Sequence, residues 1–314
     1  MTNSVLNDYI AEVSSIVERD VKNEREKKKI LKHLLELQKT KINIMIVGGT
    51  GVGKSSTINA LFETEKAKVG QGVDPETKVI EKYEMDNLVL WDTPGLGDSK
   101  EEDRKHTEII RRKLTETDED GHLLIDLVLV IVDGSSRDLG STYQLINDVV
   151  IPYYGKENSS RIIIAINQAD IAMKGLGHWD MENNCPKPEL EEFLEQKVLS
   201  IKRRVFESTG VTVDPIYYSA GYKEGDKPQL PYNLSKLFYY MVKNLKGEKA
   251  EKVAIMQSRQ RENFINDDMH DGGETYRRGI LDKIVDGIGA AVEFVGDTVK
   301  SVGSWVKDTF FSWW

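Results

Sequence analysis

The stretch KINIMIVGGTGVGKSS, residues 41–56, decides the fold of this chain. Its first half is a continuous apolar run, which is typical of a strand buried on both faces of a parallel sheet. Its second half matches G-x-x-x-x-G-K-[ST], with Gly48, Gly53, Lys54 and Ser55 at the fixed positions. Glycines let successive backbone N–H groups turn toward phosphate oxygens, and a helix start adds a favourable dipole. The pattern predicts a strand, a phosphate-binding loop and a helix from about Lys54.

The loop supplies the residues that we expect to contact the phosphates. Lys54 is predicted to reach the β- and γ-phosphates, and Ser55 is predicted to ligate Mg²⁺. The predicted contacts form one run, which is Gly49, Thr50, Gly51, Val52, Gly53, Lys54, Ser55 and Ser56. A glycine-rich turn with a chance lysine is the alternative, and the flanking strand and helix argue against it.

Residues 89–100, VLWDTPGLGDSK, indicate a strand that runs into a phosphate-sensing turn. Asp92 ends this strand and is predicted to hold Mg²⁺ through water. Gly95 is predicted to donate its N–H to the γ-phosphate. The next residue is Leu96, at a place where many nucleotide switches have an amide side chain that positions the attacking water. Leucine cannot do this, so another group must act if the chain hydrolyses a nucleotide.

The segment 64–80 lacks periodicity and is interpreted as a mobile loop. Within it, Thr77 is predicted to close on Mg²⁺ when the γ-phosphate is present, although another threonine nearby would serve. The predicted catalytic residues are thus Lys54, Thr77 and Gly95, and the predicted metal ligands are Ser55, Thr77 and Asp92.

The base is expected to be recognised farther along the chain. The sequence INQAD, residues 166–170, closes an apolar strand with the spacing N-x-x-D. Asp170 can accept from both guanine N1–H and the exocyclic amine, a donor pair that adenine lacks, so GTP is favoured over ATP. Asn167 is expected to brace the adjoining loops, although a helix cap is an alternative role for both side chains. The predicted base-binding residues are Asn167, Gln168, Asp170, Ser219 and Ala220, the last through an N–H to guanine O6.

The composition of the 314 residues narrows the possible classes of protein. The net charge of −9 argues against a nucleic-acid partner, because duplex affinity rests largely on phosphate neutralisation by Lys and Arg. The single cysteine, Cys185, cannot form an internal disulfide, which favours a reducing compartment. The chain has no run of about 18 apolar residues and no signal-peptide core at its start, so the sequence predicts a cytoplasmic protein.

Apolar runs alternate with helical patterns through the middle of the chain, which predicts an α/β sheet with helices on both faces. Six strands are expected, at 41–49, 79–84, 87–92, 125–133, 161–167 and 214–219. Helical patterns lie between them, and residues 171–188 are interpreted as a surface insertion. We therefore predict a helical segment at 1–40, a nucleotide-binding domain at 41–246 and a C-terminal helical segment at 247–314.

The sequences GGTGVGKSSTINALF, WDTPGLGDS and NQAD resemble the P-loop GTPases of the translation-factor class, on their septin, GIMAP and Era-like side. Within that side they most resemble the bacterial YfjP-like GTPases, and they are similar to interferon-inducible immunity GTPases and chloroplast import receptors. The resemblance implies a Ras-like G domain with a mainly parallel six-stranded sheet, and Mg²⁺-dependent hydrolysis of GTP to GDP. Gln168 replaces the family's lysine, and Gly51 replaces the asparagine of potassium-activated members.

The resemblance also bears on Leu96. Family members with an apolar residue here commonly complete the active site by pairing G domains or by receiving a group from elsewhere. The expected function is a slow GTP-binding switch that a partner or a G-domain homodimer stimulates. A GTP-dependent scaffold with negligible turnover and a dynamin-like membrane-associated mechanoenzyme stay open as alternatives.

Residues 280–314 carry an apolar stripe from Leu281 to Phe310, which includes three tandem heptads at 288–308. Repeated glycines flank this stripe and weaken its helix propensity, so it needs a surface on which to fold. Three surfaces stay open: the N-terminal helices of the same chain, a membrane contacted peripherally, and a second protomer.

Overall fold

The computed structural model describes residues 5–62, 68–70, 80–96, 99–137, 139–174, 176–221, 229–257, 260–268, 273–292 and 304. Within these residues the main sheet has seven strands in the order β2-β3-β4-β1-β5-β6-β9. Its parallel strands are β1 (Ile42–Gly48), β4 (Leu88–Asp92), β5 (Leu127–Asp133), β6 (Ile162–Asn167) and β9 (Ile216–Tyr217). At one edge, β3 (Glu81–Met85) pairs antiparallel with both β4 and β2 (Lys68–Gly70). The predicted fold class is confirmed, and β2 is a three-residue strand beyond the six expected.

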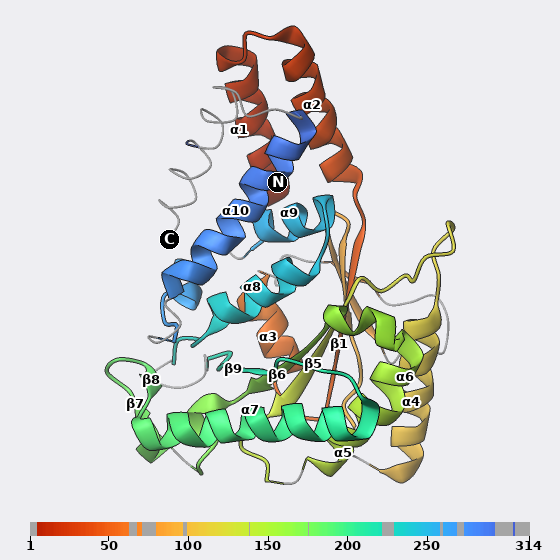
Figure 1. Cartoon of the computed structure of the whole chain (residues 1–314), viewed down its shortest axis with the longest axis vertical. Coiled ribbons are helices and arrows are strands. Elements are labelled where there is room, and N and C mark those ends of the chain that lie inside the picture. Colours follow the sequence, from red (N-terminus) through yellow and green to blue (C-terminus); the bar gives the residue numbers. More distant parts are fainter. Residues whose placement is uncertain are drawn as a thin grey trace.

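Alternate side chains of the central strands face two separate cores. In β1, Ile44 and Ile46 lie in one core, whereas Met45 and Val47 lie in the other. Helices α3 (Lys54–Leu61) and α8 (Leu234–Asn244) cover the first face, and α4 (Lys100–Thr115), α6 (Ile151–Tyr154) and α7 (Pro188–Thr209) cover the second (Figure 1). A π-helical turn, Leu145–Val150, joins α5 (Gly140–Gln144) to α6. The segment interpreted as an insertion contains a small hairpin, β7 (Trp179–Asp180) and β8 (Cys185–Pro186).

Both ends of the chain contribute to one group of helices, which we call the helical cap. It consists of α1 (Val5–Asp20), α2 (Glu24–Lys39), α9 (Glu248–Ile255) and α10 (Gly273–Val292) (Figure 1). The apolar faces of these helices join the first core, and Ile280, Leu281, Ile284 and Ile288 of α10 are all buried there. The first part of the apolar C-terminal stripe therefore packs on the chain itself. The stripe beyond Val292 lies outside the described residues.

Two glycines permit close packing of α10. A Cβ atom on Gly279 would collide with the ring of Tyr239, and one on Gly287 would collide with the side chain of Glu251. Glu251 is fully buried, and one of its oxygens lies 2.8 Å from Nε2 of His33 on α2. The cap is thus held by tight packing and by a buried polar contact. None of the described helices is both long and apolar enough to cross a bilayer.

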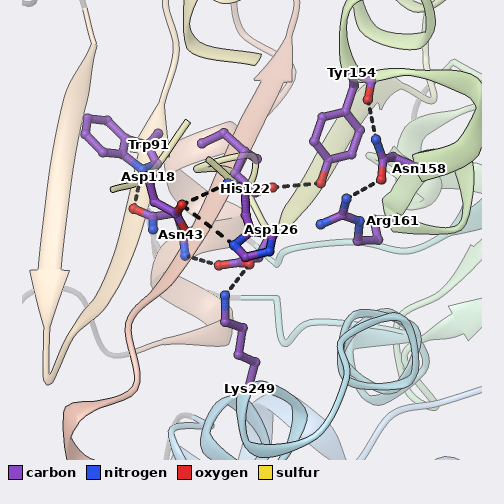
Figure 2. A network of polar contacts seen from close by, with 10 residues as sticks. Asn43, Trp91, Asp118, His122, Asp126, Tyr154, Asn158, Arg161 and Lys249 are labelled. Carbon is purple, nitrogen blue, oxygen red and sulfur yellow. Dashed lines mark hydrogen bonds and ion pairs between the residues drawn. The ribbon is translucent and has the colours of Figure 1, made fainter. Parts of the chain in front are cut away.

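Asp126 attaches the cap to the amino end of the parallel strands (Figure 2). It stands just before β5 and is 6% exposed. One carboxylate oxygen accepts from the backbone N–H of Asn43 at 2.9 Å, and the other accepts from Lys249 Nζ on α9 at 2.6 Å. Trp91 Nε1 donates to the Asn43 side chain at 3.1 Å, which extends the network to β4. Both oxygens of this buried carboxylate are therefore paired.

Residues 260–268 connect the cap to the rest of the fold. The side-chain amide of Asn263 donates to the carbonyl of Ala60 in α3 at 3.2 Å. Asn233, which is fully buried, accepts from a backbone N–H of this segment at 2.7 Å and donates to the carbonyl of Tyr217 in β9 at 3.1 Å. The segment thus contacts the helix that follows the glycine-rich loop directly, and it is linked to the last strand of the sheet through Asn233.

Candidate functional site

The glycine-rich loop follows β1 and ends where α3 begins, as the sequence predicts. Gly51 and Gly53 have φ values of 75° and 89°, a region that residues with a Cβ rarely adopt. A Cβ on Gly53 would also collide with the side-chain amide of Asn167. Lys54 Nζ donates to the carbonyl of Gly49 at 2.9 Å, so the lysine lies along the loop that it is predicted to serve. Ser55 and Ser56 occupy the first turn of α3.

Ser55 and Asp92 meet beside this loop, although 37 residues separate them in the sequence. The Ser55 hydroxyl donates to Asp92 Oδ2 at 2.7 Å, and Asp92 is 6% exposed. The other oxygen, Oδ1, is buried and has no hydrogen-bond partner among the described residues. Burial raises the pKa of Asp92, and the Ser55 hydrogen bond and the charge of Lys54 only partly oppose this.

A divalent cation would fit this pair. Mg²⁺ prefers oxygen ligands and keeps several of its waters, so it could be held by the Ser55 hydroxyl and, through water, by the unpaired oxygen of Asp92. Its charge would also offset the unfavourable burial of the carboxylate. The third predicted metal ligand, Thr77, lies outside the described residues.

The turn after Asp92 packs against the glycine-rich loop. The N–H of Thr50 donates to the Leu96 carbonyl at 3.0 Å, and the N–H of Leu96 approaches the Gly48 carbonyl at 3.4 Å. Gly95 lies so close to Thr50 that a Cβ there would collide with the Thr50 backbone. The Leu96 side chain is partly buried against the core on the α4 face. Leu96 therefore acts through its backbone and its packing, and its side chain contributes no group for catalysis.

The base-recognition residues gather at the neighbouring strand ends. The Asn167 side chain donates to the Val52 carbonyl at 2.9 Å and accepts from the Ala220 N–H at 3.0 Å, which is the bracing role that the sequence suggested. Gln168 Nε2 donates to the Gly51 carbonyl at 3.1 Å, so a second residue ties this strand end to the loop. Because the Ala220 N–H is already used by Asn167, a contact to guanine O6 would have to share or replace that bond.

Asp170 lies half-buried next to these residues. Burial raises the pKa of its carboxyl, and a hydrogen bond from Ser219 lowers it in part. A ligand that donated two N–H groups would stabilise the charged form of this carboxylate. The pair Asp170 and Ser219 therefore suits the recognition of a guanine edge.

Two further side chains contact the backbone around the site, and sequence reasoning missed both. Lys197 of α7 donates to the carbonyls of Gly134 and Ser136 at 2.5 and 2.7 Å, and the N–H of Gly134 donates to the Asn167 carbonyl at 2.7 Å. His106 of α4 contacts the Gly95 carbonyl through Nδ1 at 3.0 Å. These side chains bind backbone carbonyls, which leave no recognisable pattern in a sequence.

Known proteins match the stretch of sequence that contains most of this site. Residues 43–168 match the family described as 50S ribosome-binding GTPase. The chain is 28% identical over 202 residues to the tRNA modification GTPase MnmE of Syntrophomonas wolfei, covering 58% of this chain and 40% of that protein. It is 26% identical over 151 residues to the uncharacterized protein YfjP of Escherichia coli, covering 46% of this chain and 47% of that protein.

A further relative matches a shorter stretch of the chain, and a solved structure matches it at lower sequence identity. The chain is 39% identical to mouse interferon-gamma-inducible GTPase 10 over 72 residues, which are 20% of this chain and 17% of that protein. Among solved structures, the LeoA bacterial dynamin GTPase from ETEC is 16% identical with a TM-score of 0.43, covering 96% of this chain and 46% of that one. The chain spans less than half the length of each of these relatives.

Proposed function

We propose that this chain, in which residues 43–168 belong to the G domain of a P-loop GTPase, binds GTP with Mg²⁺ and hydrolyses it slowly to GDP. One observation carries the proposal. Asp92 is buried beside Lys54 and Ser55 with one carboxylate oxygen unpaired among the described residues, and a bound cation would supply a partner for that oxygen.

Three groups of residues would bind the phosphates, the Mg²⁺ and the guanine base. The loop N–H groups and Lys54 would bind the phosphates and offset negative charge as the terminal phosphoryl group is transferred. Ser55 and Asp92 would hold the Mg²⁺, which neutralises charge on the phosphates. Asn167, Gln168 and Asp170 would select guanine at the neighbouring strand ends.

A low rate follows from Leu96, because no side chain at that position can orient the attacking water. The missing group would come from outside the G domain that binds the nucleotide. The G domain of a second copy of this chain, or another partner protein, would supply it. Such groups add about 10³–10⁵ in rate where they are used. We propose that the chain acts as a switch in the cytoplasm, with assembly or peripheral membrane contact as its output.

Titrations with the intact chain test the assignment of the ligand. Lys54→Ala should weaken GTP binding by at least about a hundredfold, since it removes the charge that contacts two phosphates. Asp170→Asn should weaken GTP binding and strengthen XTP binding, because the amide can donate to the xanthine oxygen. The wild-type chain with ATP is the control. Equal GTP affinity in all three proteins would show that the ligand is wrongly assigned.

A GTP-dependent scaffold is the second candidate, and the partial burial of the apolar Leu96 side chain against the α4 face favours it. Phosphate release measured over a wide range of protein concentration separates the two. Specific activity that rises with concentration supports a GTPase completed by assembly. Release that stays at the rate of buffer alone, with GTP bound, supports the scaffold.

A further inference from the structure

We propose that His106 is a positioning residue that links helix α4 to Gly95, and so to the presence of the γ-phosphate. The inference rests on the proposed GTP binding and deepens it, because it names how the site would report which nucleotide is bound. It starts from the 3.0 Å contact between His106 Nδ1 and the Gly95 carbonyl.

The chemistry of this contact fixes which nitrogen carries the proton. A carbonyl oxygen only accepts hydrogen bonds, so Nδ1 of His106 must be the donor. The bond spans 11 positions of the chain and leaves the turn at Gly95 for the second turn of α4 (Lys100–Thr115). The ring therefore bridges the turn and the helix directly.

Both polar groups of the peptide between Gly95 and Leu96 have hydrogen-bond partners. His106 donates to its carbonyl, and its N–H approaches the carbonyl of Gly48 at 3.4 Å. The next carbonyl, that of Leu96, accepts from the Thr50 N–H at 3.0 Å. Gly95 is the residue whose own N–H is predicted to bind the γ-phosphate. Gain or loss of the γ-phosphate at that N–H would rotate the Gly95 backbone. The Gly95 carbonyl would then move relative to the His106 ring that donates to it.

The first half of helix α4 is less tightly packed than its second half, so it can move more easily. Its two buried residues, Ile110 and Leu114, both lie in the second half, where they pack into the core. The start of the helix is capped by Ser99, which accepts from the Glu102 N–H at 3.2 Å. Because Ser99 already makes the N-cap hydrogen bond, α4 does not need His106 in order to begin at this position. The bond to Gly95 is therefore best explained as a link to the site.

Two substitutions separate positioning from simple stabilisation. His106→Ala removes the donor, whereas His106→Asn places an amide N–H close to where Nδ1 stands. Lys105→Ala is the matched control, because within the described part of the chain this neighbour makes an exposed ion pair with Glu101 at 3.1 Å and no other polar contact. Each protein is titrated with a non-hydrolysable GTP analogue and with GDP, and its melting temperature is recorded.

We expect His106→Ala to lower the affinity for the GTP analogue about fivefold, as for one hydrogen bond of ordinary net strength, with GDP affinity unchanged. His106→Asn should recover most of the loss, and Lys105→Ala should behave as wild type. Hydrogen exchange over residues 100–108 should differ between the analogue and GDP in the wild type, and this difference should disappear in His106→Ala.

Two results overturn the link. One is an unchanged ratio of the two affinities in His106→Ala, and the other is no recovery of that ratio in His106→Asn. An unchanged ratio together with a lower melting temperature shows a purely structural bond. If the wild-type chain binds neither nucleotide, the proposed function fails together with the link.

Discussion

Asp92 and Asp126 lie at opposite ends of the parallel strands, and each is 6% exposed. At the amino end, both oxygens of Asp126 are paired, one with the Asn43 N–H and one with Lys249. At the carboxyl end, Asp92 accepts from Ser55 and leaves Oδ1 without a partner among the described residues. Equal burial therefore serves two purposes. The amino end is arranged for stability, and the carboxyl end keeps an unfavourable group that a bound cation would satisfy.

The largest effect is expected from Asp126→Ala. The substitution leaves the buried N–H of Asn43 without its acceptor and breaks the ion pair to Lys249, which is partly exposed. We expect the free energy of unfolding to fall by about 3 kcal/mol, while nucleotide affinity changes less than about twofold. Denaturant unfolding and a nucleotide titration check this. A clear loss of affinity at unchanged stability would break the division between the two ends.

Gly287→Ala tests the packing of the cap at a smaller scale. The new Cβ would collide with the buried Glu251, so we expect a loss of about 2 kcal/mol in unfolding free energy. Gly289→Ala is the matched control on the same helix, because no atom of the described residues lies within 4 Å of its added Cβ. That change should stabilise the chain by about 0.5–1 kcal/mol through helix propensity. If both variants melt alike, the close approach of α10 to α9 is wrong.

Asp92→Asn should have a smaller effect of the opposite sign. Burial raises the pKa of Asp92, so in the range just above the usual value of 3.8 the native state binds more protons than the unfolded state. Stability then falls as pH rises through this range, and the loss is complete above the raised pKa. At pH 7 without Mg²⁺, we expect Asp92→Asn to stabilise the nucleotide-free chain by about 1 kcal/mol.

Two comparisons sharpen this result. Near pH 3 the wild type and the variant should be nearly equal in stability, because both side chains are then neutral. Mg²⁺ with GTP should raise the melting temperature of the wild type and leave that of Asp92→Asn almost unchanged. A destabilised variant at pH 7 without Mg²⁺ would show that Asp92 is as structural as Asp126.

Leu96→Gln is expected to change least. The Leu96 side chain packs toward the core, and its backbone is fixed by Thr50 and Gly48, so a glutamine here is not directed at the phosphate. Single-turnover hydrolysis should rise less than about tenfold, which corresponds to about 1.4 kcal/mol in the barrier. A larger rise would mean that the missing amide alone limits the rate.

The sequence predicted the sheet and the main site residues for identifiable reasons. A continuous apolar run such as β1 is buried on both faces, and Asp92 and Asn167 follow such runs at strand ends that parallel pairing brings together. The same logic could not find β2, whose three residues are strand only because β3 offers them an edge. Pairing, rather than local pattern, decides such a short strand.

Other features depend on how helices are placed in space. Lys197 and His106 bind backbone carbonyls from α7 and α4, and any lysine or histidine on a helix surface has the same local sequence character. The apolar stripe of the C-terminal segment was recognised, but its pattern did not say what covers it. The structure shows the answer for Leu281, Ile284 and Ile288, which are buried among the helices of the cap.

The bond from Asn263 to Ala60 joins the segment before α10 to the helix that carries Lys54 and Ser55. Such a connection obeys reciprocity, because a coupling free energy between two sites has the same size in both directions. Any partner that binds α10 and tightens nucleotide binding by some factor must itself be bound more tightly by that factor when nucleotide is present. A partner on the helical cap would therefore change the affinity for nucleotide only to the extent that bound nucleotide changes the affinity for that partner.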